Sequence, residues 1–96
     1  LLRQGGRVRD LHTLAVEQVR AEAQAVAADR LLPLLTEREA AVYRRGRNAR
    51  TARTDGAYHK ATGLEALFGY LYLSGETARL RELFDEAMTA IGETAG

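Results

Sequence analysis

One acidic side chain, Glu65, stands within the most apolar stretch of the chain, residues 61–73. Burying an ionised carboxylate costs free energy unless it is paired with a cation, binds a metal ion or reaches water. Carboxylates hold Mg²⁺, and Mg²⁺ beside basic groups is the arrangement that cleavage of a phosphodiester requires. A structural ion pair is the other common use of a lone glutamate, and the spacing of the residues leaves both uses open.

Basic residues gather just before this stretch, in residues 44–60, where there is one acid. The six basic residues are Arg44, Arg45, Arg47, Arg50, Arg53 and Lys60. The segment has a net charge of +5, whereas the rest of the chain has a net charge of −4. A basic segment on a mildly acidic body predicts contact with a polyanion. A solvated arginine-rich loop is the alternative interpretation.

The acid of this basic segment is Asp55. It lies in residues 47–56, which lack apolar periodicity and are expected to form an exposed loop. Asp55 either caps the helix that follows or approaches Glu65 as a second acid of a metal site. Two carboxylates are enough in number for Mg²⁺, which keeps several of its waters.

Helices are expected to position these residues. Residues 21–32 are rich in alanine and predict a helix that Pro33 stops, because proline lacks a backbone donor. The sequence Thr36-Glu37-Arg38-Glu39 is a capping box and predicts the start of a second helix. That helix is expected to run to about Arg45, with Gly46 as its stop.

A central helix is predicted over residues 58–73, where apolar side chains recur at helical spacing. The pattern is apolar nearly all round, which is typical of a buried helix. Gly63 and Gly69 remove bulk where a neighbouring backbone could come close. A last helix is predicted over residues 76–91, followed by a frayed tail at 92–96.

Length and composition limit the class of fold. The chain has 96 residues, a single proline, 46% hydrophobic residues and no strand candidate, which predicts one small all-α domain, a helical bundle. The absence of cysteine excludes a disulfide framework and a thiolate metal site. The same absence of cysteine suits a cytoplasmic location. No apolar run reaches the roughly 18 residues of a membrane span, so no membrane partner is expected. Residues 1–6 read as the end of a helix with a glycine stop, so the chain is expected to begin inside a helix.

Two motifs resemble a known family when they occur together in this order. The first is Arg44-Arg45-Gly46-Arg47-Asn48-Ala49, and the second is Ala61-Thr62-Gly63-Leu64-Glu65-Ala66-Leu67-Phe68-Gly69-Tyr70-Leu71-Tyr72-Leu73. Both are similar to Mini-ribonuclease III, a ribonuclease III catalytic domain without the usual double-stranded RNA-binding domain. The resemblance also includes Val19-x-Ala21-x-x-Gln24-Ala25 and covers nearly the whole chain.

The resemblance implies an all-α homodimer of the ribonuclease III endonuclease fold that cleaves double-stranded RNA with Mg²⁺, typically in maturation of large-subunit ribosomal RNA. Glu65 matches the family's C-terminal metal-binding glutamate, and Asp55 matches an acid in the loop. Arg47 and Asn48 fall in the basic motif, whose role is RNA contact. Thr62 stands where larger ribonuclease III enzymes carry an aspartate, which is typical of the mini subtype.

The family's first signature helix, with a Gly-Asp-Ala motif and the catalytic aspartate, is not among these residues. Residues 1–96 are therefore expected to be a partial domain that cleaves RNA poorly by itself. Two alternatives belong to other classes of protein. One is a non-catalytic helical module that binds RNA through residues 44–60, and the other is a structural dimerisation module whose interface includes Tyr70 and Tyr72.

Overall fold

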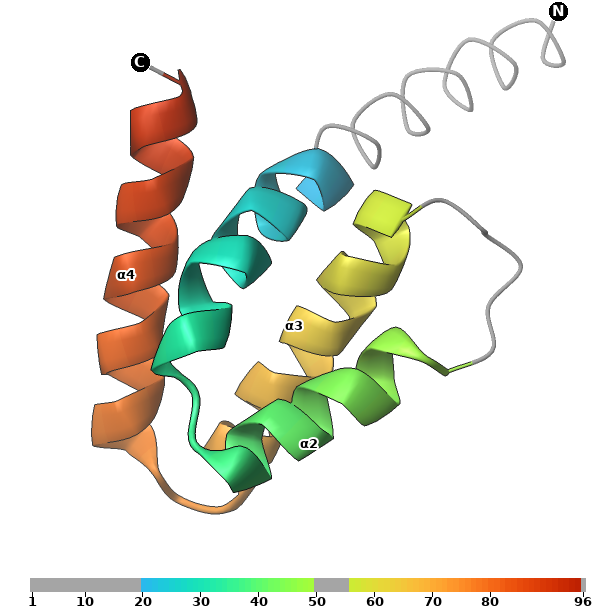
Figure 1. Cartoon of the computed structure of the whole chain (residues 1–96). Helices are drawn as coiled ribbons and strands as arrows, with labels where there is room; N and C mark the ends of the chain where they lie inside the picture. The colour runs from blue at the N-terminus through green and yellow to red at the C-terminus, as the bar shows by residue number, and fades with distance from the viewer. Residues whose placement is uncertain (1–19, 50–55, 96) are drawn as a thin grey trace, which may run out of the picture.

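The computed structural model describes residues 20–49 and 56–95, all of which form helices and their connections (Figure 1). A helical segment at residues 20–31 leads into a 3₁₀ turn, η1, at Leu32–Leu34. Helix α2 spans Glu37–Arg47, α3 spans Gly56–Leu73 and α4 spans Thr77–Ala95. The prediction of an all-α fold is confirmed. Predictions that fall on residues 1–19 and 50–55 lie outside the described residues.

The core lies where helical segment 20–31, α3 and α4 meet. Leu64, Leu67 and Leu71 face inward from α3, and each is at most 4% exposed. They pack with buried side chains of the other two helices, which are Ala27, Leu31, Leu83 and Ala87. The central position of α3 therefore agrees with its apolar sequence.

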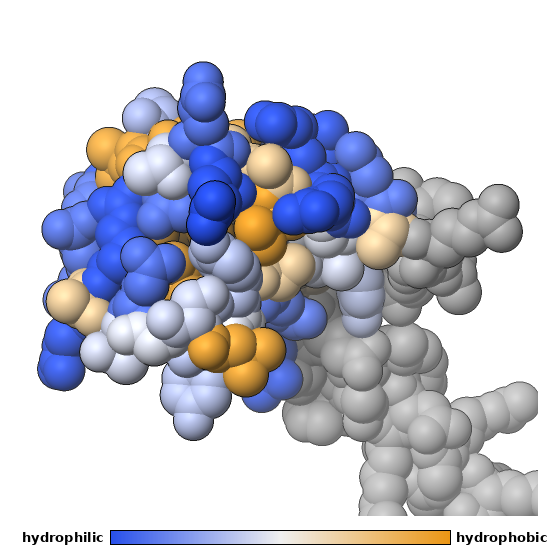
Figure 2. All heavy atoms as spheres, turned by 90° about the horizontal axis from the view of Figure 1, so that it is seen from below, coloured by the Kyte–Doolittle hydropathy of each residue, from blue (hydrophilic) through white to orange (hydrophobic). Residues whose placement is uncertain are grey.

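The prediction that α3 is buried nearly all round is wrong at its C-terminal end. Tyr72 is 67% exposed and Leu73 is 84% exposed, next to the exposed turn at Ser74 and Gly75. Gly75 has a φ of +74°, a conformation that glycine adopts without strain. Seen from below the view of Figure 1, the molecule shows hydrophobic groups among hydrophilic side chains (Figure 2). No helix of the described residues is long and apolar enough to cross a membrane.

Helix α2 crosses α3 at two glycines. A Cβ on Gly46 would lie 2.5 Å from the Cβ of Ala66 and 3.1 Å from the Cα of Gly63. A Cβ on Gly63 would lie 2.8 Å from the ring of Tyr43 and 2.9 Å from its carbonyl oxygen. Real Cβ atoms do not approach that closely, so the crossing requires glycine at both positions. Gly46 is thus a packing residue inside α2 and not the helix stop that the sequence predicted.

An ion pair between the buried Glu39 and the half-buried Arg79 holds the start of α2 to α4. Thr36 and Glu39 form the predicted capping box, in which Thr36 Oγ1 accepts from the Glu39 amide at 3.2 Å and Glu39 Oε1 accepts from the Thr36 amide at 2.9 Å. Arg79 donates to both carboxylate oxygens of Glu39, at 2.8 and 2.9 Å, and to the Leu34 carbonyl at 2.8 Å. These hydrogen bonds from Arg79 are the main reason that the pKa of Glu39 is lowered.

The bounds of the helices differ from prediction by a few residues. Helix α2 ends at Arg47, with Asn48 as its C-cap, and α3 begins at Gly56. Residues 92–95, predicted as a frayed tail, are helical because α4 runs through Ala95. A Cβ on Gly69 would have nothing within 4 Å, so the close approach predicted there is wrong.

Gly63 and Gly69, two glycines in the interior of α3, should respond oppositely to substitution by alanine. Gly63→Ala is expected to lower the free energy of unfolding by about 1–3 kcal/mol, because the new methyl group collides with the buried Tyr43. Gly69→Ala is the matched control and should raise that free energy by about 0.5–1 kcal/mol, because its site is open and alanine favours helix. Urea unfolding followed by circular dichroism measures both, and equal effects would contradict the crossing geometry.

The Glu39–Arg79 pair should make stability depend on pH. Because the pKa of Glu39 is lowered below its ordinary value of 4.5, its contribution is present above pH 4.5 and lost as pH falls through the folded-state pKa. Glu39→Gln keeps the capping geometry but removes the charge, so it should cost about 2 kcal/mol at pH 7. The deficit should shrink in acid.

Glu37→Gln is the control for this prediction, since Glu37 is exposed in the first turn of the same helix. Thermal unfolding between pH 3 and pH 7 measures both variants. A Glu39→Gln protein whose stability follows pH as the wild type does would show that the ion pair has no such role.

Candidate active site and nucleic-acid interface

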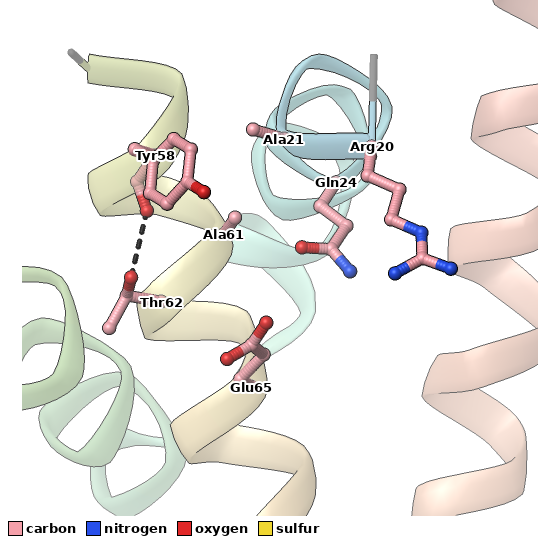
Figure 3. A pocket seen from close by; sticks show the side chains of 7 residues that line it. All are labelled: Arg20, Ala21, Gln24, Tyr58, Ala61, Thr62 and Glu65. Atoms are coloured by element: carbon pink, nitrogen blue, oxygen red, sulfur yellow. Dashed lines mark hydrogen bonds between the residues drawn. The ribbon is translucent and has the colours of Figure 1, made fainter. Parts of the chain in front are cut away.

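Glu65 faces a hollow between α3 and helical segment 20–31 (Figure 3). The hollow has a volume of about 260 Å³. Its lining comes from both helices and consists of Arg20, Ala21, Gln24, Tyr58, Ala61, Thr62 and Glu65. The two alanines are small and buried, so the walls leave room between the polar side chains.

The carboxylate of Glu65 is exposed and forms no hydrogen bond or ion pair with any described residue. Its neighbour Leu64 is buried in the core, and one residue along a helix turns the side chain by about 100°. Glu65 therefore points away from the core, although the surrounding sequence is apolar. Within the described part of the chain, the structural ion pair that the sequence left open is not formed.

Thr62 lies one turn before Glu65 on the same side of α3. Its hydroxyl donates to the carbonyl oxygen of Tyr58 at 2.9 Å, a bond within the helix that Figure 3 shows as a dashed line. A hydroxyl used in this way is a weaker candidate for binding a ligand. Among the residues that line the hollow, Glu65 carries the one carboxylate.

The donor set of the hollow fits part of a magnesium site. Mg²⁺ binds to one or two protein carboxylates and keeps several waters, and Glu65 offers one carboxylate open to water. Among residues 20–49 and 56–95, no group of three or more histidine, cysteine, aspartate or glutamate side chains could hold a metal ion. Asp55, predicted as a further acid, lies outside the described residues, so its role stays a prediction.

The basic end of α2 lies beside this part of α3. A Cβ on Gly46 would meet Thr62, three residues before Glu65, and Ala66, the residue after it. Arg44 and Arg45 are exposed in the same last turn of α2. The glycine crossing therefore brings the predicted RNA-binding arginines close to the helical turn that carries the carboxylate.

Two further residues of the basic motif have local contacts. Arg47 donates from Nε to the side-chain oxygen of Asn48 at 3.3 Å, and its carbonyl oxygen lies 3.1 Å from Nδ1 of His59. The contact with His59 joins the end of α2 to the first turns of α3. Arg50 and Arg53 lie outside the described residues, so their predicted RNA contacts stay predictions.

Lys60 has a partner that the sequence did not predict. Its ammonium group forms an ion pair with Asp29, with distances of 2.9 and 3.1 Å to the two carboxylate oxygens. The pair joins α3 to helical segment 20–31. The RNA contact predicted for Lys60 stays a prediction, and it requires Lys60 to exchange a carboxylate for a phosphate.

Sequence reasoning missed the wall of the hollow opposite Glu65. Arg20 and Gln24 lie more than forty positions from Glu65 along the chain, and only the packing of the helices shows that they share a cavity. The one sequence signal was the place of Gln24 in a motif of the resembled family. No periodicity or charge pattern indicated that this residue belongs with Glu65.

Comparison with known proteins identifies the class of protein to which the chain belongs. The ribonuclease III domain matches residues 1–76 of the chain. Mini-ribonuclease 3 of Symbiobacterium thermophilum is 46% identical over 86 residues, which are 84% of this chain and 66% of that protein. The proteins of the same name from Synechocystis and Enterococcus faecalis are 49% and 41% identical, covering 80% and 88% of this chain and 56% and 69% of their own lengths. No solved structure matches the chain significantly.

The chain belongs to the Mini-ribonuclease 3 family, and the resemblance stated from its motifs is confirmed. It spans about 60% of the length of the curated relatives that it matches.

Proposed function

We propose that the protein is an endoribonuclease that cleaves double-stranded RNA with Mg²⁺. The observation that supports this most is the open, unpaired carboxylate of Glu65 in a hollow of a chain from the Mini-ribonuclease 3 family. Glu39 is paired with Arg79, whereas Glu65 has no partner among the described residues. Glu65 remains available for a ligand.

Glu65 holds the metal ion in this proposal. When bound, Mg²⁺ activates water and neutralises charge that develops on phosphate oxygens during cleavage. Glu65 fixes the position of the ion on a rigid helix, and its exposure leaves coordination places free for water and substrate. We place Asp55 as a second acid of the same site, as the resemblance implies.

The basic motif holds the RNA backbone. A-form RNA is recognised mainly through its shape, phosphates and 2′-hydroxyl groups, so exposed arginines suit it better than groups that read bases. The proposed contacts are Arg44, Arg45, Arg47, Asn48, Arg50, Arg53 and Lys60. Lys60 can leave Asp29 at low cost, since an exposed ion pair contributes at most about 1 kcal/mol.

The family resemblance supports a proposal for the substrate and the assembly. We propose that the RNA is a precursor of large-subunit ribosomal RNA, processed in the cytoplasm by a homodimer. Exposed apolar side chains such as Tyr72, Leu73, Phe84 and Met88 favour association, because removing apolar surface from water lowers the free energy. A dimer also places two sites across the two strands of one duplex.

We also propose that residues 1–96 form one ribonuclease III-like domain with incomplete catalytic equipment. The resemblance places an essential aspartate in a Gly-Asp-Ala helix, and the 96 residues do not contain that motif. With Glu65 as the main acid of the hollow, the chain by itself should cleave slowly. Joining a helix that carries the Gly-Asp-Ala motif to these 96 residues should raise the rate.

The test uses a labelled RNA duplex of about 30 base pairs and Mg²⁺. The 96-residue chain is compared with the same chain joined to the preceding segment of the Symbiobacterium thermophilum relative. The joined protein should cleave at least about 100-fold faster, and Glu65→Gln should abolish most of that gain without changing the melting temperature, because Glu65 has no structural partner. Replacing both Arg44 and Arg45 by alanine should raise KM severalfold and leave kcat nearly unchanged.

Arg81→Ala is the matched control, since Arg81 is an exposed arginine on α4 and is not one of the proposed RNA contacts. Full activity of the Glu65→Gln protein would exclude the metal role. Salt-dependent binding of the duplex without cleavage by either protein would instead favour the non-catalytic RNA-binding module. Absence of both binding and cleavage would favour the structural module.

A further inference from the structure

The wall of the hollow that faces Glu65 is polar, although the helix that forms it is rich in alanine. Arg20 and Gln24 are four residues apart, so they lie on one face of helical segment 20–31. Both line the same hollow as Glu65, and Figure 3 shows the carboxylate of Glu65 and the amide of Gln24 extending into the space between the helices. The buried Ala21 also lines the hollow and adds little bulk to its wall.

Neither Arg20 nor Gln24 has a structural use within the described part of the chain, where neither forms a hydrogen bond or ion pair. Other polar side chains of the same helix do. Asp29 binds Lys60 of α3, and Arg30 binds Glu86 and Glu93 of α4. The two long polar side chains that lack partners are thus the two that line the hollow with Glu65.

We propose that Arg20 and Gln24 hold a phosphate of the RNA strand beside Glu65, as positioning residues for the scissile bond. This inference rests on the proposed function. A guanidinium can donate two parallel N–H bonds to phosphate oxygens, and the amide NH₂ of glutamine can donate one more. The Mg²⁺ of the proposed function would lie between this phosphate and the Glu65 carboxylate. Figure 3 shows the Arg20 guanidinium beyond the Gln24 amide as seen from Glu65, so Arg20 would supply positive charge on the other side of the phosphate.

The size of the hollow suits this occupant. At about 30 Å³ for each water in the liquid, a volume of about 260 Å³ has room for several water molecules, which a phosphate and part of a metal hydration shell would replace. Ala21 and Ala61 line the hollow with small side chains, which leaves the space between the polar groups free of bulk. Residues 44–48 would hold the duplex at a second place, on α2.

The experiment measures binding of the 96-residue chain to a labelled RNA duplex, so that it does not depend on cleavage. Dissociation constants are compared in Mg²⁺ and in EDTA, at several salt concentrations, for wild type, Arg20→Ala, Arg20→Lys, Gln24→Ala and the control Arg81→Ala. Melting temperatures check that each variant is folded. In Mg²⁺, Arg20→Ala should weaken binding about tenfold and reduce the salt slope by about 1, while Gln24→Ala should weaken it about threefold. Arg20→Lys should recover part of the affinity, and Arg81→Ala should bind as wild type.

A double-variant cycle separates a phosphate contact from general charge attraction. If Arg20 and Glu65 hold the same phosphate group, one directly and one through Mg²⁺, the tenfold effect of Arg20→Ala should fall to about twofold in a Glu65→Gln background. Wild-type protein that binds duplex RNA more tightly in Mg²⁺, with Arg20→Ala and Gln24→Ala variants that bind equally well, would overturn this inference and leave the proposed function standing. Wild-type protein that does not bind duplex RNA would overturn both.

Discussion

The close crossing of α2 over α3 is the constraint on which the site depends. At Gly46 and Gly63 the two helices approach so closely that a single methyl group on either would collide with the other helix. The ring of Tyr43, only 2% exposed, fills the space beside Gly63. This contact fixes the rotation of α3 about its axis, which sends Leu64 into the core and Glu65 outward. It also places the last turn of α2, with its arginines, beside the residues that flank Glu65.

Glu39 of α2 and Glu65 of α3 have different surroundings, and these suit the two carboxylates to different roles. Glu39 is 5% exposed, caps its own helix and accepts two hydrogen bonds from Arg79, so its negative charge is fully used in joining α2 to α4. Glu65 is exposed in a hollow and has no partner among the described residues. A carboxylate that the fold leaves accessible and unpaired can bind a cation without breaking any structural contact. Stability and the proposed chemistry are thus assigned to different acids.

Much of the fold could be predicted from the sequence because its signals are local. The capping box at Thr36 and Glu39 fixed the start of α2, and apolar periodicity located α3 and its core face. Glu65 could be singled out because it is the one charge in an apolar run. Gly46 was misinterpreted because a glycine near the end of a helix looks the same whether it stops the helix or lets another helix approach. The difference is visible only once α3 is in place.

The rest of the site depends on contacts between distant parts of the chain. The partnership of Lys60 with Asp29 joins residues that lie 31 positions apart, and no charge pattern along the sequence selects Asp29 over the other acids. Arg20 and Gln24 line the same hollow as Glu65 because segment 20–31 packs beside α3. The small side chains of Ala21 and Ala61 line that hollow as well. The motif match indicated the family, while the packing showed which side chains surround the carboxylate.

In the proposed function, the outward-facing carboxylate of Glu65 is a ligand for a divalent cation. A crystal structure of the chain with Mn²⁺, which scatters anomalously and takes oxygen ligands as Mg²⁺ does, tests it most directly. An anomalous peak is expected in the hollow at coordination distance from a Glu65 oxygen, about 2.0–2.3 Å, with waters completing its shell. A Glu65 carboxylate paired with a cationic side chain, and no anomalous peak within reach of it, would exclude the metal role of Glu65.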